Sequence, residues 1–236
     1  MANTVHMRNT SPSPIAIIGS ACRFPGNATT PSKLWELLRK PRDLLKEVPR
    51  DRFYWEGFYR PDGLHGGMRT KDGYFLEENI RVFDPQFFNI LPAEAESIDP
   101  QHRILLESMY EAMESAGLTL EDLHGTDTGV FVGMMDRPYY ENATLDDGAC
   151  GGPILSTGTS RAIAANRISY TFNFRGPSMT LDSACSSSMM AVHLAVSSLR
   201  QKESSLAFAC GSQLHLNPNA FKGLTKMNMI SHDGRR

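Results

Sequence analysis

The fold of this chain is decided by the stretch Asp182-Ser183-Ala184-Cys185-Ser186-Ser187-Ser188. Residues 178–182, which lead into it, are interpreted as a strand. The apolar residues that follow, from about Ser186 to Arg200, predict a helix. Small residues between the two elements predict a sharp turn that carries Cys185 from the end of a strand to the beginning of a helix.

A cysteine at such a junction suits acyl transfer. The partial positive charge of a helix N-terminus favours the thiolate, which is the reactive form of cysteine. Free backbone N–H groups of the first helical turn can face the oxyanion of a tetrahedral intermediate. The pattern therefore indicates Cys185 as a nucleophile, although the local residues alone equally fit a small structural cysteine in a packed turn.

Outward from this turn, strands and helices alternate along the chain, and their order predicts an α/β layer structure with parallel strands. Residues 40–80 are rich in Gly, Pro, Arg, Asp and aromatic residues, and are expected to be irregular. The other expected elements are strands at 14–19, 128–133 and 206–210, a glycine-rich loop at 148–158, a helix at 160–171, and helices that begin at Thr30-Pro31 and at Asp99-Pro100, the second ending at Gly117.

Composition excludes several classes of protein. With 24 basic and 26 acidic residues the net charge is −2, which does not favour binding to nucleic acid. No apolar stretch is long enough to span a bilayer, and the polar N-terminus lacks a signal-peptide core, so a cytoplasmic location is expected. The four cysteines form no CxxC pair and no cluster with histidine, which argues against a metal site and a disulfide framework.

The Cys185 stretch resembles the nucleophile motif of β-ketoacyl synthases, the condensing domains of polyketide and fatty acid synthases. Further segments resemble that family in the same order, and their details are most similar to the reducing polyketide synthases of fungi. These segments are Ile15-Ala16-Ile17-Ile18-Gly19, Ala21-Cys22-Arg23-Phe24-Pro25-Gly26, Val48-Pro49-Arg50-Asp51-Arg52-Phe53, Phe83-Asp84-Pro85-Gln86-Phe87-Phe88, Asp99-Pro100-Gln101-His102-Arg103, Ala165-Asn166-Arg167-Ile168-Ser169-Tyr170, Arg175-Gly176-Pro177-Ser178 and Ser231-His232-Asp233-Gly234-Arg235.

The resemblance implies a thiolase-like layered α/β sandwich, of which residues 14–236 supply the N-terminal half after a disordered tail at 1–13. It implies decarboxylative Claisen condensation, in which Cys185 takes an acyl group and its own backbone N–H is one oxyanion donor. The substrates are acyl and malonyl thioesters on the phosphopantetheine arm of an acyl carrier protein. No directly bound cofactor and no metal are expected.

The sequence departs from the family pattern in its histidines. The family uses two, in a His-Gly-Thr-Gly-type and an Asn-x-Gly-His-type motif, and neither motif occurs in these 236 residues. We therefore expect the isolated chain to be inactive in condensation. It is also expected to form a homodimer, or to associate with the missing C-terminal half, because the helix at 186–200 would otherwise leave apolar residues exposed.

Two other functions remain open at this point. The chain could be a non-catalytic remnant that binds acyl groups or pairs with a full-length synthase. It could also be a thiolase-like acyltransferase that uses CoA esters.

Among the remaining candidates, Cys22 and Cys210 are interpreted as packing residues and Cys150 as exposed in the glycine-rich loop. His193 lies eight residues after Cys185 on the same helix, roughly 12 Å along it, and is interpreted as a packing residue rather than its base. His102 stands where the family usually carries glutamine, and a structural or surface role is expected.

Overall fold

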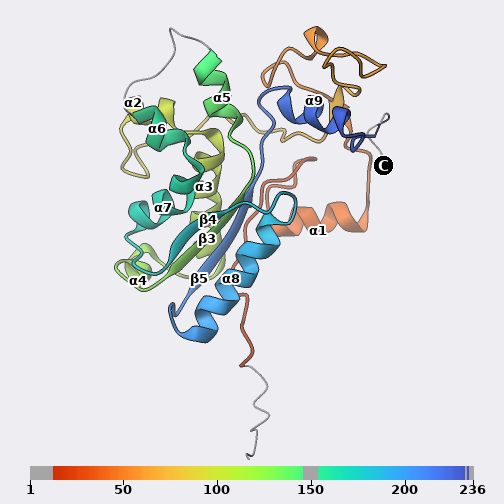
Figure 1. Cartoon of the computed structure of the whole chain (residues 1–236). Coiled ribbons are helices and arrows are strands. Elements are labelled where there is room, and N and C mark those ends of the chain that lie inside the picture. The colour runs from red at the N-terminus through yellow and green to blue at the C-terminus, as the bar shows by residue number, and fades with distance from the viewer. Residues whose placement is uncertain (1–12, 146–153, 232, 234–236) are drawn as a thin grey trace, which may run out of the picture.

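A computed structural model describes residues 13–145, 154–231 and 233, and its centre is a parallel sheet (Figure 1). In this part of the chain, β3 (Gly129–Met134) lies between β4 (Ser178–Leu181) and β5 (Ala207–Ser212). Val130 of β3 is level with Ser178 of β4 and with Phe208 of β5. The parallel α/β arrangement expected from the sequence is confirmed, and all three strands end at the same edge of the sheet.

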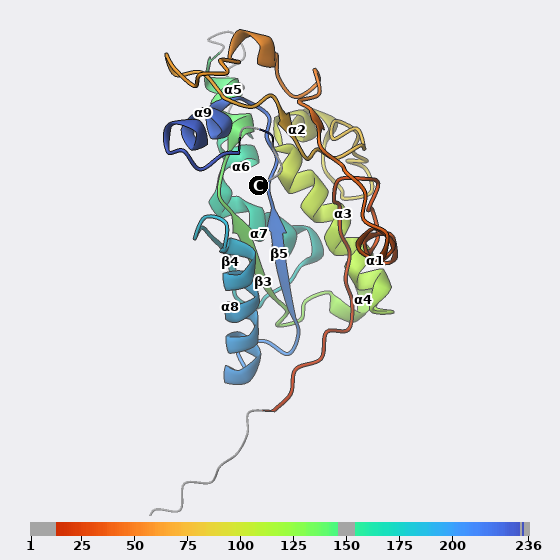
Figure 2. The same ribbon diagram turned by 90° about the vertical axis from the view of Figure 1, so that its right-hand side faces the viewer.

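Helices cover both faces of the sheet (Figure 2). On one face, α3 (Pro100–Ser115) and α7 (Arg161–Phe172) pack against Val130 and Val132 in the main hydrophobic core. On the other face, α8 (Ser187–Gln201) packs against Phe131. The side chains of β3 alternate between the two cores because successive residues of a strand point to opposite faces.

The helix α8 places its small residues against the sheet and its large ones away from it. Its buried residues are Ser187, Ala191, Ala195 and Ser198. Met189 is 69% exposed, and Met190, Val192 and His193 are also exposed. The expected exposure of apolar residues on this helix is confirmed, whereas the interpretation of His193 as a packing residue is wrong because it lies on the outward face.

The long helix α3 begins and ends where the sequence indicates. Asp99 is its N-cap and accepts a hydrogen bond from the Gln101 N–H at 2.8 Å, with Pro100 in the first turn. Gly117, at a φ of +71°, follows its end. The Gln101 side chain donates to the Asp136 carbonyl at 3.2 Å and accepts from the Leu214 N–H at 3.1 Å, so this helix fastens the segments that leave β3 and β5.

His102, in the first turn of α3, has a structural place rather than a surface one. Its side chain is 1% exposed, and neither ring nitrogen has a hydrogen-bond partner among the described residues. Burial, with a smaller contribution from the Arg167 charge, lowers the pKa of His102 to about 3. The imidazole is therefore held neutral inside the core.

We expect His102→Gln to reduce the acid sensitivity of the fold. Below pH 6.5 the unfolded chain binds a proton at His102 and the folded chain does not, so the free energy of unfolding falls as the pH drops toward 3. The loss is about 1.4 kcal/mol per pH unit from this group. Urea unfolding of both chains at pH 6.5 and 4.5 measures the difference.

A second buried group contributes the opposite slope to both chains, so the comparison isolates His102. Burial raises the pKa of Asp99 to about 6, and stability from that carboxyl is lost as the pH rises from about 4 through 6. Parallel stability curves for the two chains would contradict the role given to His102.

Two expected elements at the N-terminal side and in the middle of the chain are wrong. Residues 14–19 form an extended segment but no strand, and Ile17 is 91% exposed. A strand requires a hydrogen-bonded neighbour, whereas this segment is held by α3: a Cβ at Gly19 would lie 2.2 Å from the Ala112 carbonyl oxygen. The described part of the expected loop at 148–158 belongs to the helix α6 (Ile154–Thr159). Cys150 and the expected tail up to residue 12 lie outside the described residues.

The expectation of little regular structure at 40–80 is confirmed. The segment contains the two-residue strands β1 (Lys46–Glu47) and β2 (Asp72–Gly73) and the short 3₁₀ helix η1 (Trp55–Gly57). It builds a second, smaller core in which Val48, Met68 and Phe75 pack against Phe221 of α9 (Asn219–Lys226). The remaining helices are α1 (Pro31–Arg39), which Thr30 caps as expected, and the unexpected α2 (Pro92–Ser97), α4 (Leu120–Leu123) and α5 (Pro138–Leu145).

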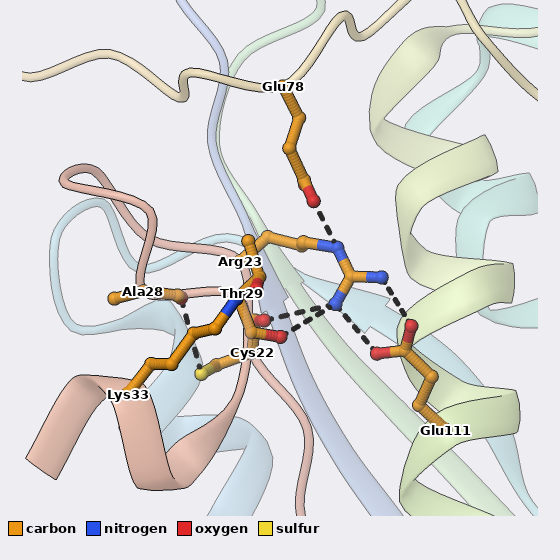
Figure 3. Close-up of polar contacts among 7 residues, drawn as sticks. All are labelled: Cys22, Arg23, Ala28, Thr29, Lys33, Glu78 and Glu111. Carbon is orange, nitrogen blue, oxygen red and sulfur yellow. Dashed lines mark hydrogen bonds and ion pairs between the residues drawn. The ribbon is translucent and has the colours of Figure 1, made fainter.

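The N-terminal loop is tied to α3 by Arg23 (Figure 3). Its guanidinium forms a bidentate ion pair with Glu111 of α3, and its Nε lies 3.1 Å from a Glu78 oxygen. It also donates to the carbonyls of Cys22 and Thr29, each at 3.1 Å. One partly buried arginine thus joins three segments that are far apart in the sequence.

Candidate functional site

Cys185 lies in the turn between the end of β4 and the beginning of α8, as the sequence predicts. Its side chain is exposed, and α8 begins two residues later at Ser187. The residue before it, Ala184, has a φ of +56°, a left-handed conformation that is uncommon for residues with a Cβ. The turn is therefore strained at the position next to the thiol, which is where an exposed nucleophile needs a sharp change of chain direction.

Serine hydroxyls form hydrogen bonds to the backbone within this turn. The Ser187 Oγ accepts from the Ser183 N–H at 2.9 Å and donates to the Ala184 carbonyl at 2.6 Å. The Ser186 hydroxyl donates to the Ser183 carbonyl at 2.8 Å. The run of serines thus serves the backbone of the turn.

The N–H groups of the first helical turn are less available than expected. Ser186 N–H donates to the Ser183 carbonyl at 3.4 Å, and Ser187 N–H donates to the Ala184 carbonyl at 3.1 Å. Both donors are used because the tight turn bends two carbonyls toward them. These two donors are therefore engaged within the turn, and the role of the Cys185 N–H as an oxyanion donor stays a prediction.

Asp182 and Arg161 hold the turn from the strand side. The Asp182 carboxylate accepts from the Ala184 N–H at 2.9 Å through one oxygen and from Arg161 at 2.6 Å through the other. These bonds, that of Ala184 first, lower the pKa of Asp182, so it is ionised at neutral pH. Arg161, the first residue of α7, also donates to the Met135 carbonyl just beyond β3.

Two glycines that sequence reasoning missed give α8 its place. Gly133 of β3 and Gly211 of β5 are level in the sheet. A Cβ at Gly133 would lie 2.5 Å from the Ser187 carbonyl carbon, and one at Gly211 would lie 2.8 Å from the Ser188 Cβ. The first turn of the helix thus rests directly on the backbone of the sheet. A glycine inside each apolar strand was the available signal, since such glycines mark close approach of another backbone.

Polar residues gather where the three strands end. Asp136 follows β3, Asp182 follows β4, and Gln213 follows β5. The Gln213 side chain donates to Asp136 at 2.8 Å. Ligands of parallel α/β sheets bind at this carboxyl edge, so the position of Cys185 suits a substrate that approaches from the same side.

The other two cysteines that the structure describes are poorly suited to nucleophilic chemistry. Cys22 is half-buried, its thiol donates to the Ala28 carbonyl at 3.6 Å, and burial raises its pKa (Figure 3). Cys210 packs against the main core, and burial raises its pKa to about 12. Among the residues that the structure describes, no group of three or more His, Cys, Asp and Glu side chains could hold a metal ion.

The described histidines are spread over the molecule. His124 contacts the Asn173 amide, and His215 packs edge-on against Phe221. His215 and Asp136 line a cavity of about 190 Å³ with Glu141 and Asn217. In the described part of the chain, no histidine hydrogen-bonds to the turn from Asp182 to Ser188, so no general base for Cys185 is identified there.

The model of the β-ketoacyl synthase N-terminal domain matches residues 12–236, nearly the whole chain. The chain belongs to the β-ketoacyl synthase family. It is 52% identical over 236 residues to a hybrid polyketide synthase–nonribosomal peptide synthetase, mycA, of Thermothelomyces thermophilus, covering all of this chain and 6% of that protein. It is 51% identical to lovastatin nonaketide synthase mokA of Monascus pilosus, covering 94% of this chain and 7% of that protein.

Solved ketosynthase domains confirm the thiolase-like α/β fold. The oxazolomycin ketosynthase domain OzmH KS7 of Streptomyces albus JA3453 has a TM-score of 0.85 at 39% identity, covering 93% of this chain and 38% of that one. The ketosynthase from module 6 of the bacillaene synthase of Bacillus subtilis 168 has a TM-score of 0.80 at 36% identity, covering 93% and 35%. This β-ketoacyl synthase chain thus spans a small part of its curated relatives and somewhat over a third of these domains.

Proposed function

We propose that Cys185 is the acyl-accepting nucleophile of a ketosynthase of polyketide chain extension. The observation that carries this proposal is the exposed thiol at a strained strand-to-helix turn, at the carboxyl edge of a parallel sheet. Membership of the β-ketoacyl synthase family supports it. Partial burial of Cys22 and Cys210, which raises the pKa of both thiols, supports the choice among the described cysteines.

In the proposed reaction the Cys185 thiolate attacks the carbonyl carbon of an acyl thioester. The bond from that carbon to the carrier's sulfur breaks, and the released thiol takes up a proton in place of the one that Cys185 lost. A malonyl thioester then loses CO₂, and the resulting carbanion attacks the acyl carbon. A carbon–carbon bond forms as the bond to Cys185 breaks, which restores the thiolate.

The partners in this proposal are carrier domains. The acyl and malonyl groups arrive as thioesters on the phosphopantetheine arm of an acyl carrier protein, and the named relatives are multifunctional synthases. No helix in the described part of the chain is long and apolar enough to cross a membrane. We infer a cytoplasmic location. We also infer that the chain associates through exposed apolar surface such as that of α8, either in a homodimer or with a C-terminal half of the domain.

Acyl transfer to the chain tests the proposal directly. The chain is incubated with a hexanoyl thioester of pantetheine, and intact mass followed by peptide mapping locates the acyl group. We expect one hexanoyl group, on the peptide that contains Cys185, and none on the Cys185→Ala variant. Acylation of another cysteine with Cys185 left free would refute the assignment.

Condensation by these 236 residues alone is expected to stay at background. Both histidine motifs of the family are absent from the sequence, and general acid–base help is typically worth on the order of 10²–10⁴ in rate. The measurement is CO₂ release from labelled malonyl thioester and acylated protein, with Cys185→Ala as the control. Sustained release above that control would show that another group in the chain generates the carbanion.

A further inference from the structure

We propose that Arg161 and Asp182 act as positioning residues for Cys185, and we call these two residues the 161–182 pair. The inference rests on the proposed role of Cys185 and adds two residues to its site. Neither residue touches the substrate in this proposal. Their function is to hold the backbone of the turn so that the thiol of Cys185 faces the acyl carbon while its N–H faces the acyl oxygen.

Asp182 forms a hydrogen bond to the backbone of Ala184 in the turn. One carboxylate oxygen of Asp182 accepts the Ala184 N–H at 2.9 Å, and Ala184 has a φ of +56°. An alanine in this left-handed conformation relaxes to a more common one unless the surroundings hold it. Asp182 supplies such a hold from the residue that leaves β4, immediately before the turn.

Asp182 also forms an ion pair with Arg161. The other carboxylate oxygen binds the Arg161 guanidinium at 2.6 Å, and the same Arg161 nitrogen donates to the Met135 carbonyl. Arg161 begins α7, on the face of the sheet opposite α8. The 161–182 pair therefore links the turn at Cys185 to the end of β3 and to the helix layer behind the sheet.

Acyl transfer requires a more exact geometry at Cys185 than alkylation does. Alkylation of a thiol by a small reagent requires little more than access to the sulfur. Acylation by a thioester also requires a donor aimed at the developing oxyanion, at a distance and angle that the backbone sets. Loosening the turn should therefore slow acylation much more than alkylation.

The experiment compares these two rates at Cys185 in variants of the whole chain. Asp182→Ala removes both contacts of the carboxylate, and Arg161→Gln removes the guanidinium that binds Asp182 and the Met135 carbonyl while it leaves the contact between Asp182 and Ala184 in place. In each we expect the acylation rate with the hexanoyl thioester to fall roughly tenfold to a hundredfold, because small misplacements of reacting groups have effects of that size. The rate of iodoacetamide alkylation should change by less than about threefold, and Arg161→Lys should recover part of the acylation rate.

A second substitution separates positioning from a general loss of structure. Ala184→Gly removes the conformational cost of the left-handed residue, so it should restore part of the acylation rate of Asp182→Ala. Arg42→Gln is the matched control, since Arg42 also donates to a backbone carbonyl, that of Gly26 at 2.8 Å, in another part of the chain. This control should leave both rates at Cys185 unchanged.

The outcomes distinguish the two proposals. If the unaltered chain is not acylated at Cys185, the proposed function fails. If it is acylated but Arg161→Gln behaves like Arg42→Gln, or Ala184→Gly gives no recovery in Asp182→Ala, the positioning role is overturned while the nucleophile stands. Equal losses of acylation and alkylation would also overturn it, because they would indicate that the turn has unfolded.

Discussion

Gly133→Ala should displace the N-terminus of α8 and abolish most acylation of Cys185. The added Cβ would lie 2.5 Å from the carbonyl carbon of Ser187, 2.6 Å from the N of Ser188 and 2.7 Å from the Ser187 carbonyl oxygen. All three are backbone atoms, so no side chain can rotate away to make room. The helix must move, and Cys185 lies two residues before its first residue.

The expected effects are large for the addition of one methyl group. Overpacking of a close contact costs about 1–3 kcal/mol of stability. We expect a cost near the upper end of this range, because only backbone atoms can move to relieve the contact. Displacement of the turn should lower the acylation rate by on the order of 10². Thermal unfolding and the hexanoyl thioester assay measure the two effects on the same sample.

Gly223→Ala is the matched control for this substitution. Gly223 lies inside α9, and a Cβ there would have no heavy atom within 4 Å apart from the helix itself. Because alanine is a better helix former than glycine, this change should stabilise the chain by about 0.5–1 kcal/mol and leave acylation intact. Equal behaviour of the two variants would mean that α8 does not rest on Gly133.

Thiol reactivity should differ widely among the described cysteines, with Cys210 the slowest to react. Burial raises the pKa of Cys210 to about 12, so at pH 8 only about one molecule in 10⁴ carries its thiolate. The Cys22 thiol is half-buried, donates to the Ala28 carbonyl and also has a raised pKa. Cys185 is exposed, so it should react before both.

Limited iodoacetamide treatment at pH 8, followed by peptide mapping, measures this order. Labelling in a denaturant is the control, because unfolding removes the burial that protects Cys210 and Cys22, and the rates should then converge. Preferential labelling of Cys22 or Cys210 in the folded chain would contradict the assignment of Cys185 as the accessible thiol.

Elements whose signals are local could be predicted from the amino-acid sequence alone. The helix that Asp99 caps, the strand at Gly129–Met134 and the strand–turn–helix around Cys185 each depend on residues within one segment. Capping, apolar periodicity and small residues at a turn act over a few positions, so they can be read without knowing what lies nearby. The resemblance to the family could be recognised in the same way, because it rests on short motifs and their order along the sequence.

The residues that support the site could not be predicted from the sequence, because long-range packing brings them together. Gly133 and Gly211 are 78 positions apart, yet they lie side by side beneath the first turn of α8. Arg161 reaches Asp182 and Met135 from the helix α7, and His102 is buried. Such contacts arise from packing between layers, and no local pattern encodes the partner.

The extended segment at 14–19 illustrates the same limit from the other side. Its apolar residues and terminal glycine are typical of a buried strand, yet Ile17 is almost fully exposed and the segment lies on α3 through Gly19. A strand is defined by the neighbour to which it hydrogen-bonds, and that neighbour is a property of the assembled sheet. Local pattern therefore predicted an extended chain correctly, and pairing, which depends on distant residues, decided that it is not a strand here.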